Sequence, residues 1–197
     1  MLSFNGNKLL TTGGGGMIAT DDAALARRDN YLTTQAKDER VEAVHKEVGY
    51  NYRFTNAQAA VGCALLERFE EFLRSKRRIA ARCADGFGDL PRLTTIAEAP
   101  WASSGFWLYT VLIDAAGFRI DSRSLIRSLR ESGIEARPLW EPRPQSPARV
   151  GSLALGCPVA ERLTEQSRCP PSSTALAVPH QDQVIDAVRA AAARRSR

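Results

Sequence analysis

The residue best suited to covalent chemistry is Lys8, which stands in the N-terminal stretch SFNGNKLLTTGGGG. A free lysine amine has a pKa of about 10.4 and is a poor nucleophile near neutral pH. In a pocket or beside other cationic groups it can lose its proton and condense with an aldehyde, as pyridoxal phosphate requires. Backbone N–H groups of the glycine-rich turn could help to bind the phosphate of that cofactor.

The same lysine also has a simpler interpretation. Glycine clusters are common in turns, where a lysine is solvated and unreactive. A Walker A loop is excluded, because that motif places its glycines before the lysine, whereas Gly13–Gly16 follow Lys8. Spacing alone therefore leaves two alternatives, a Schiff-base lysine and a surface charge.

Four stretches, taken in order, resemble one known family. They are SFNGNK with LLTTGGGGMIATDD, GYNYRFTNAQAAVGCALLERFEEF over 49–72, SGIEARPLWEP, and CPPSSTALAVPHQDQVIDAV. Together they resemble the DegT/DnrJ/StrS family, the nucleotide-sugar aminotransferases of the aspartate-aminotransferase superfamily. The similarity covers essentially the whole chain, and the first two stretches are its most specific part.

The resemblance implies roles for three cofactor-binding residues. Lys8 matches the family lysine that forms the internal aldimine with pyridoxal 5'-phosphate and then acts as general base and acid. Ser3 matches a serine that hydrogen-bonds the cofactor phosphate; the alternative is a simple turn serine. Asn51 matches an asparagine that reaches the phosphate bound by the other subunit of a dimer; the alternative is an Asx-turn.

The resemblance also places four residues near the substrate. Asn5 and Asn7 contact the substrate or only shape the loop around Lys8. Tyr52 and Arg53 line the junction between subunits or form an exposed aromatic–cation pair at the start of a helix. The two histidines, His45 and His180, belong to no motif, and we expect them at the surface.

The implied reaction is a two-stage amino transfer. Glutamate gives its amino group to the cofactor, which then passes it to a keto group of a nucleotide-activated sugar, as in polysaccharide biosynthesis. Related sugar dehydratases replace the lysine by histidine, so Lys8 argues against that activity. The expected partners are the nucleotide-sugar substrate, the amino-acid donor and a second subunit in a homodimer with a shared active site.

The family places most of its large cofactor domain upstream of this lysine. We therefore expect the chain to be a C-terminal piece, from a truncated gene, a misplaced start codon or a split protein. The segment RPQSPARV after Trp140–Pro142 also lacks the family's usual histidine. One alternative function is a catalytically inactive fragment that pairs with an intact paralogue, and another is an unrelated basic binding module.

The implied fold class is α/β, the C-terminal part of an aspartate-aminotransferase-type enzyme. We expect a remnant of the large cofactor domain over 1–54, a long linking helix over 55–90 and a small α+β domain over 91–197. Capping-box spacing at Thr55 and Gln58 begins the helix, which ends near Gly86–Gly88. Its solvent-facing side is expected to carry Glu67, Glu70, Arg74, Lys76 and Arg77.

Shorter elements follow from caps and apolar patterns. We expect helices after the caps Asp21–Asp22 and Asp121, ending near Tyr31 and Ser132–Gly133. Further helices are predicted over 159–166 and 181–193, and strands over 17–20, 106–113 and 134–140. Residues 1–16 are expected to be loop.

Composition limits the other classes. The chain has 197 residues and a formal net charge of +5, but its basic residues are dispersed and only 7% of residues are aromatic, so no nucleic-acid partner is expected. It contains no apolar run that would span a membrane and no signal-peptide core, which predicts a cytoplasmic protein. The four cysteines match no zinc spacing, so we expect no metal site and four small buried side chains.

Overall fold

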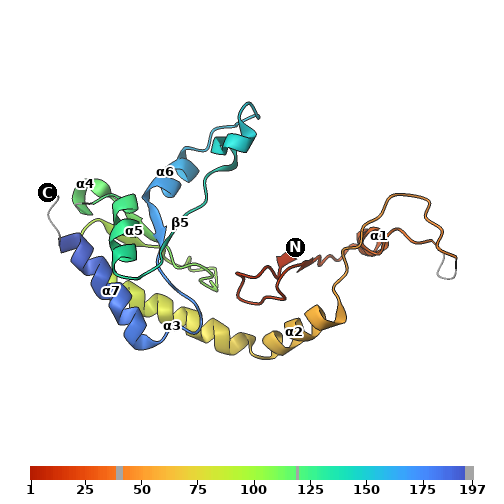
Figure 1. Ribbon diagram of the computed structural model, residues 1–197, viewed down its shortest axis with the longest axis horizontal. Helices are drawn as coiled ribbons and strands as arrows, with labels where there is room; N and C mark the ends of the chain where they lie inside the picture. Colours follow the sequence, from red (N-terminus) through yellow and green to blue (C-terminus); the bar gives the residue numbers. More distant parts are fainter. Residues whose placement is uncertain (39–41, 119, 194–197) are drawn as a thin grey trace. The chain divides into compact units, whose positions relative to one another are not determined.

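The computed structural model describes residues 1–38, 42–118 and 120–193 (Figure 1). The chain divides into two compact units, Met1–Phe72 and Leu73–Arg197, which we call the N-terminal and C-terminal units. Each is described by itself. The C-terminal residues 194–197 lie outside the described residues.

The described residues of the N-terminal unit include two short strands, two complete helices and the first turn of a third. The strands β1 (Leu2–Ser3) and β2 (Gly16–Met17) pair antiparallel, with Leu2 opposite Met17. Residues 1–16, expected as loop, thus form a hairpin, and the strand expected over 17–20 pairs only at its first residue. The helices are α1 (Ala23–Thr33) and α2 (Asn56–Glu67).

Both helices begin at the caps that the sequence predicts. The carboxylate of Asp22 accepts from the N–H groups of Ala24 and Leu25, at 2.7 and 3.1 Å. Thr55 and Gln58 form the complete capping box, each side chain bonding the other's backbone N–H. These local hydrogen bonds satisfy donors that a helix start leaves unpaired.

The single long helix expected from Thr55 is wrong, because it is two helices. After α2, Arg68 leaves the helical conformation (φ −103°, ψ 8°), and α3 (Phe69–Phe87) starts at the next residue. The Arg68 guanidinium reaches forward to Glu71, with Nη2 to Oε1 at 2.8 Å, and lies over the ring of Phe72. Because only Arg68 leaves the helical conformation, the spacing of apolar residues does not change across the break. The sequence pattern therefore does not reveal it.

The C-terminal unit is built on a four-stranded antiparallel sheet in the order β3–β4–β6–β5. Its strands are β3 (Leu93–Thr95), β4 (Val111–Ile113), β5 (Arg137–Pro138) and β6 (Ser167–Cys169). The strand expected over 106–113 pairs only from Val111 onward, because the segment before it turns at Phe106, where φ is +42°. β3 and β6 were not predicted.

The same unit also contains helices and 3₁₀ turns. They are α4 (Ala115–Phe118), α5 (Ser122–Glu131), α6 (Pro158–Gln166), α7 (Val178–Ala193) and the 3₁₀ turns η1 (Arg143–Gln145) and η2 (Pro147–Arg149). Asp121 caps α5 as predicted, accepting from Ser124 N at 2.7 Å. Figure 1 shows α7 alongside α3, where Gln181 Nε2 donates to the Ile79 carbonyl at 2.8 Å.

The core of the C-terminal unit joins α3, α5, α7 and the sheet. Its large side chains that are only 1% exposed are Ile79, Phe87, Val111, Ile113, Phe118, Leu125, Leu129 and Val188. The helical predictions over 159–166 and 181–193 fall inside α6 and α7 and are confirmed.

Three sequence expectations on burial need correction. Cys83 and Cys169 are buried as expected, but Cys63 is exposed and Cys157 is half-buried. Lys76, expected on the solvent side of the helix, is 4% exposed, because its amine bonds to oxygens of two distant segments. Both histidines, His45 and His180, are exposed as predicted.

Candidate active site

Lys8 lies on the β1–β2 hairpin of the N-terminal unit. The hairpin is closed by backbone bonds from Phe4 N to Gly15 O and from Thr12 N to Phe4 O, both at 3.0 Å. Within it, Lys8 N donates to Asn5 O at 2.9 Å, which makes a tight turn. Lys8 is half-buried. A residue at the tip of such a turn is held by the backbone rather than by a helix or a long strand.

The same hairpin carries the other three polar residues predicted around Lys8. Ser3 Oγ accepts from Asn5 N at 3.4 Å, and Asn5 Nδ2 donates to Asn7 Oδ1 at 3.2 Å. Ser3, Asn5 and Asn7 are all exposed. These local bonds give the turn its shape and leave the Ser3 hydroxyl hydrogen available to a ligand.

The glycine run closes the hairpin beyond Lys8. Gly13 and Gly15 have φ of +81° and +89°, a backbone conformation that residues other than glycine rarely adopt. Thr12 Oγ1 donates to Gly14 O at 2.5 Å, and Gly13 N donates to Thr11 Oγ1 at 2.9 Å. The positive φ values therefore explain why glycine occupies positions 13 and 15. The sequence alone did not show which glycines of the run the backbone requires.

Asn51 lies on the segment 49–54, which runs along the end of α1. Tyr50 N donates to Leu32 O at 2.7 Å and Tyr52 N donates to Thr33 O at 3.0 Å, which places Asn51 opposite Thr34. Asn51 is exposed. The rings of Tyr50 and Tyr52 stack with centroids 5.0 Å apart.

Phe54 joins this segment to the Lys8 hairpin. Its ring lies 5.8 Å from the ring of Phe4, centroid to centroid, and fills the space that a side chain at Gly15 would need. Sequence reasoning missed Phe54 and the contact that it makes with Gly15. Their contact spans 39 positions, and neither residue type signals it.

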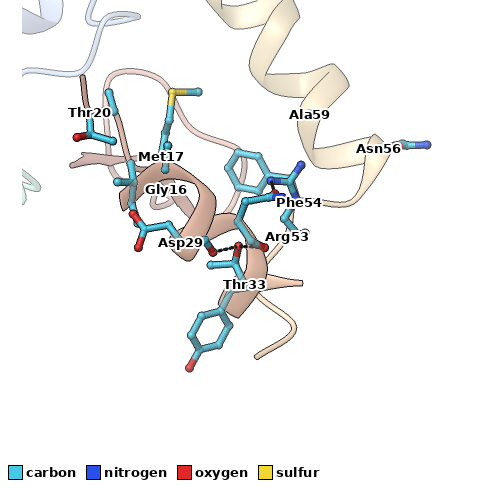
Figure 2. A pocket seen from close by; sticks show the side chains of 14 residues that line it. Gly16, Met17, Thr20, Asp29, Thr33, Arg53, Phe54, Asn56 and Ala59 are labelled. Carbon is cyan, nitrogen blue, oxygen red and sulfur yellow. Dashed lines mark hydrogen bonds between the residues drawn. The ribbon is translucent and has the colours of Figure 1, made fainter. Parts of the chain in front are cut away.

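A hollow of about 680 Å³ lies beside these elements, within the N-terminal unit (Figure 2). It is lined by Gly16–Thr20, by one side of α1, by Tyr52–Phe54 and by the start of α2. Arg53 Nη1 donates to Asn30 Oδ1 at 3.1 Å in its wall. Tyr52 and Arg53 thus share one cavity, while Lys8, Ser3, Asn5, Asn7 and Asn51 are not among its lining residues.

The predicted site residues therefore form two groups in the N-terminal unit. Lys8, Ser3, Asn5 and Asn7 share the hairpin, and Asn51, Tyr52 and Arg53 share the segment that Phe54 ties to it. In the described part of the chain, no helix is long and apolar enough to cross a membrane, and no three His, Cys, Asp or Glu side chains gather as around a metal ion.

Several solved structures share this fold. The aminotransferase TlmJ from Streptoalloteichus hindustanus matches 96% of this chain with a TM-score of 0.86 and 29% identity, over 50% of its own length. DesI, solved in the presence of its TDP-sugar product, matches 98% of this chain with a TM-score of 0.87 and 27% identity, over 49% of its own length.

The chain belongs to the DegT/DnrJ/EryC1/StrS aminotransferase family, which matches residues 1–189. It is 34% identical over 190 residues to EpsN of Bacillus subtilis, named a putative pyridoxal phosphate-dependent aminotransferase, covering 94% of this chain and 48% of EpsN. It is also 34% identical over 187 residues to GDP-perosamine synthase of Caulobacter vibrioides, covering 94% of this chain and 50% of the synthase. The chain spans about half the length of the curated relatives it matches.

Proposed function

We propose that this chain carries the cofactor-lysine part of an aminotransferase that uses pyridoxal phosphate and transfers an amino group from glutamate to a keto group of a nucleotide-activated sugar. The observation that carries the proposal is the hairpin that holds Lys8, Ser3, Asn5 and Asn7 together and is anchored by Phe54. The printed names of relatives, GDP-perosamine synthase and DesI with its TDP-sugar product, support a nucleotide-sugar substrate.

The chemistry of the hairpin fits this cofactor. An aldehyde needs a primary amine, and the hairpin offers one at Lys8. A phosphate dianion needs hydrogen-bond donors without nearby carboxylates, and no Asp or Glu precedes Asp21. Pyridoxal phosphate, when bound, supplies the electron sink for transamination.

The chain's own residues would divide the remaining work. Lys8 Nζ would hold the cofactor and would move a proton at the substrate carbon. The Ser3 hydroxyl donates to the phosphate, and Asn5 and Asn7 bound the space around the amine. Tyr52 and Arg53 offer an aromatic face and a cation to a nucleotide sugar in the hollow that they line.

The proposed assembly is a homodimer in which Asn51 reaches the phosphate held by the other subunit. The surface of α2 supports a protein partner, because its residues from Asn56 to Leu66 carry no charge, yet none of them is buried. Val61 and Leu66 are 50% and 62% exposed. An exposed apolar helix surface of this kind is typical of a surface that another protein covers, which supports the proposed dimer.

The cofactor proposal is tested by incubating the chain with pyridoxal phosphate, trapping the adduct with borohydride and mapping the labelled peptide. We expect visible absorbance and a label on Lys8 only. Lys8→Arg should lose both, and Lys46→Arg, at an exposed lysine, should retain both. A label spread over the lysines, or one that survives in Lys8→Arg, would contradict a cofactor role for Lys8.

The second candidate function is an inactive fragment that pairs with an intact paralogue, which the same α2 surface favours. The two candidate functions are distinguished by an assay that measures 2-oxoglutarate formed from glutamate in the presence of a keto nucleotide sugar. Activity of the chain alone supports the enzyme. A stable complex with a full-length relative, and no added activity, supports the fragment.

The cytoplasmic location inferred from the sequence stays a prediction.

A further inference from the structure

A buried lysine of the C-terminal unit is not among the residues of the candidate active site. Lys76 lies on α3 and is 4% exposed. Its Nζ donates to the backbone oxygen of Trp107 at 2.9 Å and to Ser172 Oγ at 3.1 Å, and it also donates to the backbone oxygen of Ser172. An ammonium group has three N–H donors, and these three oxygens use all of them.

These bonds tie together two segments that are distant in sequence. One is the stretch 107–110 that leads into β4, and the other is the stretch 170–174 that follows β6. Tyr109 N donates to Ser172 Oγ at 3.4 Å, and Ser75, the neighbour of Lys76 on α3, donates from Oγ to Thr174 O at 2.7 Å. Lys76 is the point where α3 holds both segments.

Trp107 links the Lys76 hydrogen bonds to an exposed side chain of the same unit. Its ring stacks on the ring of Trp140, with centroids 5.6 Å apart and an interplanar angle of 22°. Trp140 is 59% exposed, and Thr164 Oγ1 donates to its backbone oxygen at 3.0 Å. Lys76 fixes the position of the Trp107 backbone. It therefore also helps to fix the Trp107 ring, which is one of the two stacked indoles.

The amine lacks a compensating charge. Burial lowers the pKa of Lys76 from 10.5 to about 8, and no charged neighbour among the described residues contributes to that shift. The adjacent cations on α3 are directed elsewhere, Arg77 to Glu98 and Arg78 to Ser75 Oγ. On the facing segment, burial raises the pKa of Tyr109 to about 12, so its phenol stays neutral.

We propose that Lys76 is a proton-controlled latch on the Trp107–Trp140 stack. In the charged form, three N–H groups hold three oxygens. The neutral amine has two N–H groups and a lone pair, so one oxygen loses its donor and faces the lone pair. The segment bearing that oxygen moves away from Nζ, and the Trp107–Trp140 stack loosens. The latch does not depend on the proposed transfer reaction.

The test follows tryptophan fluorescence and near-UV circular dichroism from about pH 6.5 to about pH 9.5. The chain has three tryptophans, so Trp101→Phe leaves the stacked pair as the only indoles. In that background we expect one sigmoidal change with its midpoint near pH 8. Lys76→Gln, which keeps two N–H donors but cannot titrate, should be flat, whereas Lys46→Gln should keep the change.

Lysine side-chain NMR of the unaltered chain supplies a measurement that needs no variant. Of the four lysines, one should titrate with the same midpoint as the fluorescence change. The latch is refuted if no lysine titrates below about pH 9.5, or if the indole signal stays constant while that lysine titrates. A fluorescence change that persists in Lys76→Gln would belong to another group, such as a cysteine thiol, and would also refute it.

Discussion

A β-carbon built on Gly15 would lie 2.1 Å from Cε1 of Phe54. The two residues belong to different segments of the N-terminal unit, the Lys8 hairpin and the segment that carries Asn51. Gly15 also has φ of +89°, so its backbone conformation and its close approach both exclude a side chain. The contact is thus the point where the two groups of candidate site residues are held together.

Gly15→Ala is expected to separate the hairpin from Phe54. The ring must move, since a contact of 2.1 Å is impossible, and such overpacking costs about 1–3 kcal/mol. Amide exchange of residues 1–17 should accelerate. Gly14→Ala is the matched control, because its φ is not positive and a β-carbon there meets nothing within 4 Å. Equal exchange in both variants would show that Phe54 does not anchor the hairpin.

Glu98 should make the C-terminal unit sensitive to acid. The Arg77 guanidinium binds both carboxylate oxygens at 2.8 Å and Ser104 N donates to one of them, which lowers the pKa of Glu98 from 4.5 to about 2. The folded state thus binds fewer protons, so the stabilisation is present above pH 4.5 and is lost as the pH falls toward 2.

Thermal melting of Glu98→Gln against the parent chain checks this pH dependence. The two melting temperatures should differ most near neutral pH and converge as the pH falls below 4.5. Glu131→Gln, at an exposed position on α5, should track the parent at every pH. A difference in melting temperature between Glu98→Gln and the parent that stays constant over the acid range would mean that the carboxylate charge does not stabilise the folded state.

Phe87→Ala should strongly destabilise the C-terminal unit. The ring at the end of α3 is 1% exposed and belongs to the core, and Phe-to-Ala changes in cores cost about 3–5 kcal/mol. Denaturant unfolding followed by tryptophan fluorescence reports this unit, because all three tryptophans lie in it. Leu153→Ala, at a side chain 86% exposed, should change the free energy of unfolding by less than about 0.5 kcal/mol. Similar losses in both would contradict the assigned core.

Local signals in the sequence predicted the helix starts. Asp22, Thr55 and Asp121 each bond N–H groups two or three residues away, so the residue types and spacing suffice to find them. The break at Arg68 has no such signal, because the apolar period does not change across it. The residues 167–169 of β6 are all buried, but the stretch SRC shows no apolar alternation.

Long-range contacts explain what could not be predicted. Lys76 reads as a solvent-facing residue from its helical position, and its partners Trp107 and Ser172 are 31 and 96 positions away. The candidate site divides in the same way. Family resemblance singled out Lys8, Ser3 and Asn51, whereas the anchor between Phe54 and Gly15 depends on a tertiary contact that no single-sequence pattern encodes.

Gly49→Ala should release Asn51 from the end of α1. A β-carbon at Gly49 would lie 2.3 Å from Ala36 N and from Gln35 C, both backbone atoms that cannot give way as a side chain can. We expect faster amide exchange at Tyr50 and Tyr52, whose N–H groups bond α1 carbonyls. Val48→Ala, at a neighbouring side chain 79% exposed, should leave both amides protected. If Gly49→Ala keeps that protection too, close backbone packing is not what positions Asn51, and the pairing of Thr34 with Asn51 must be sufficient alone.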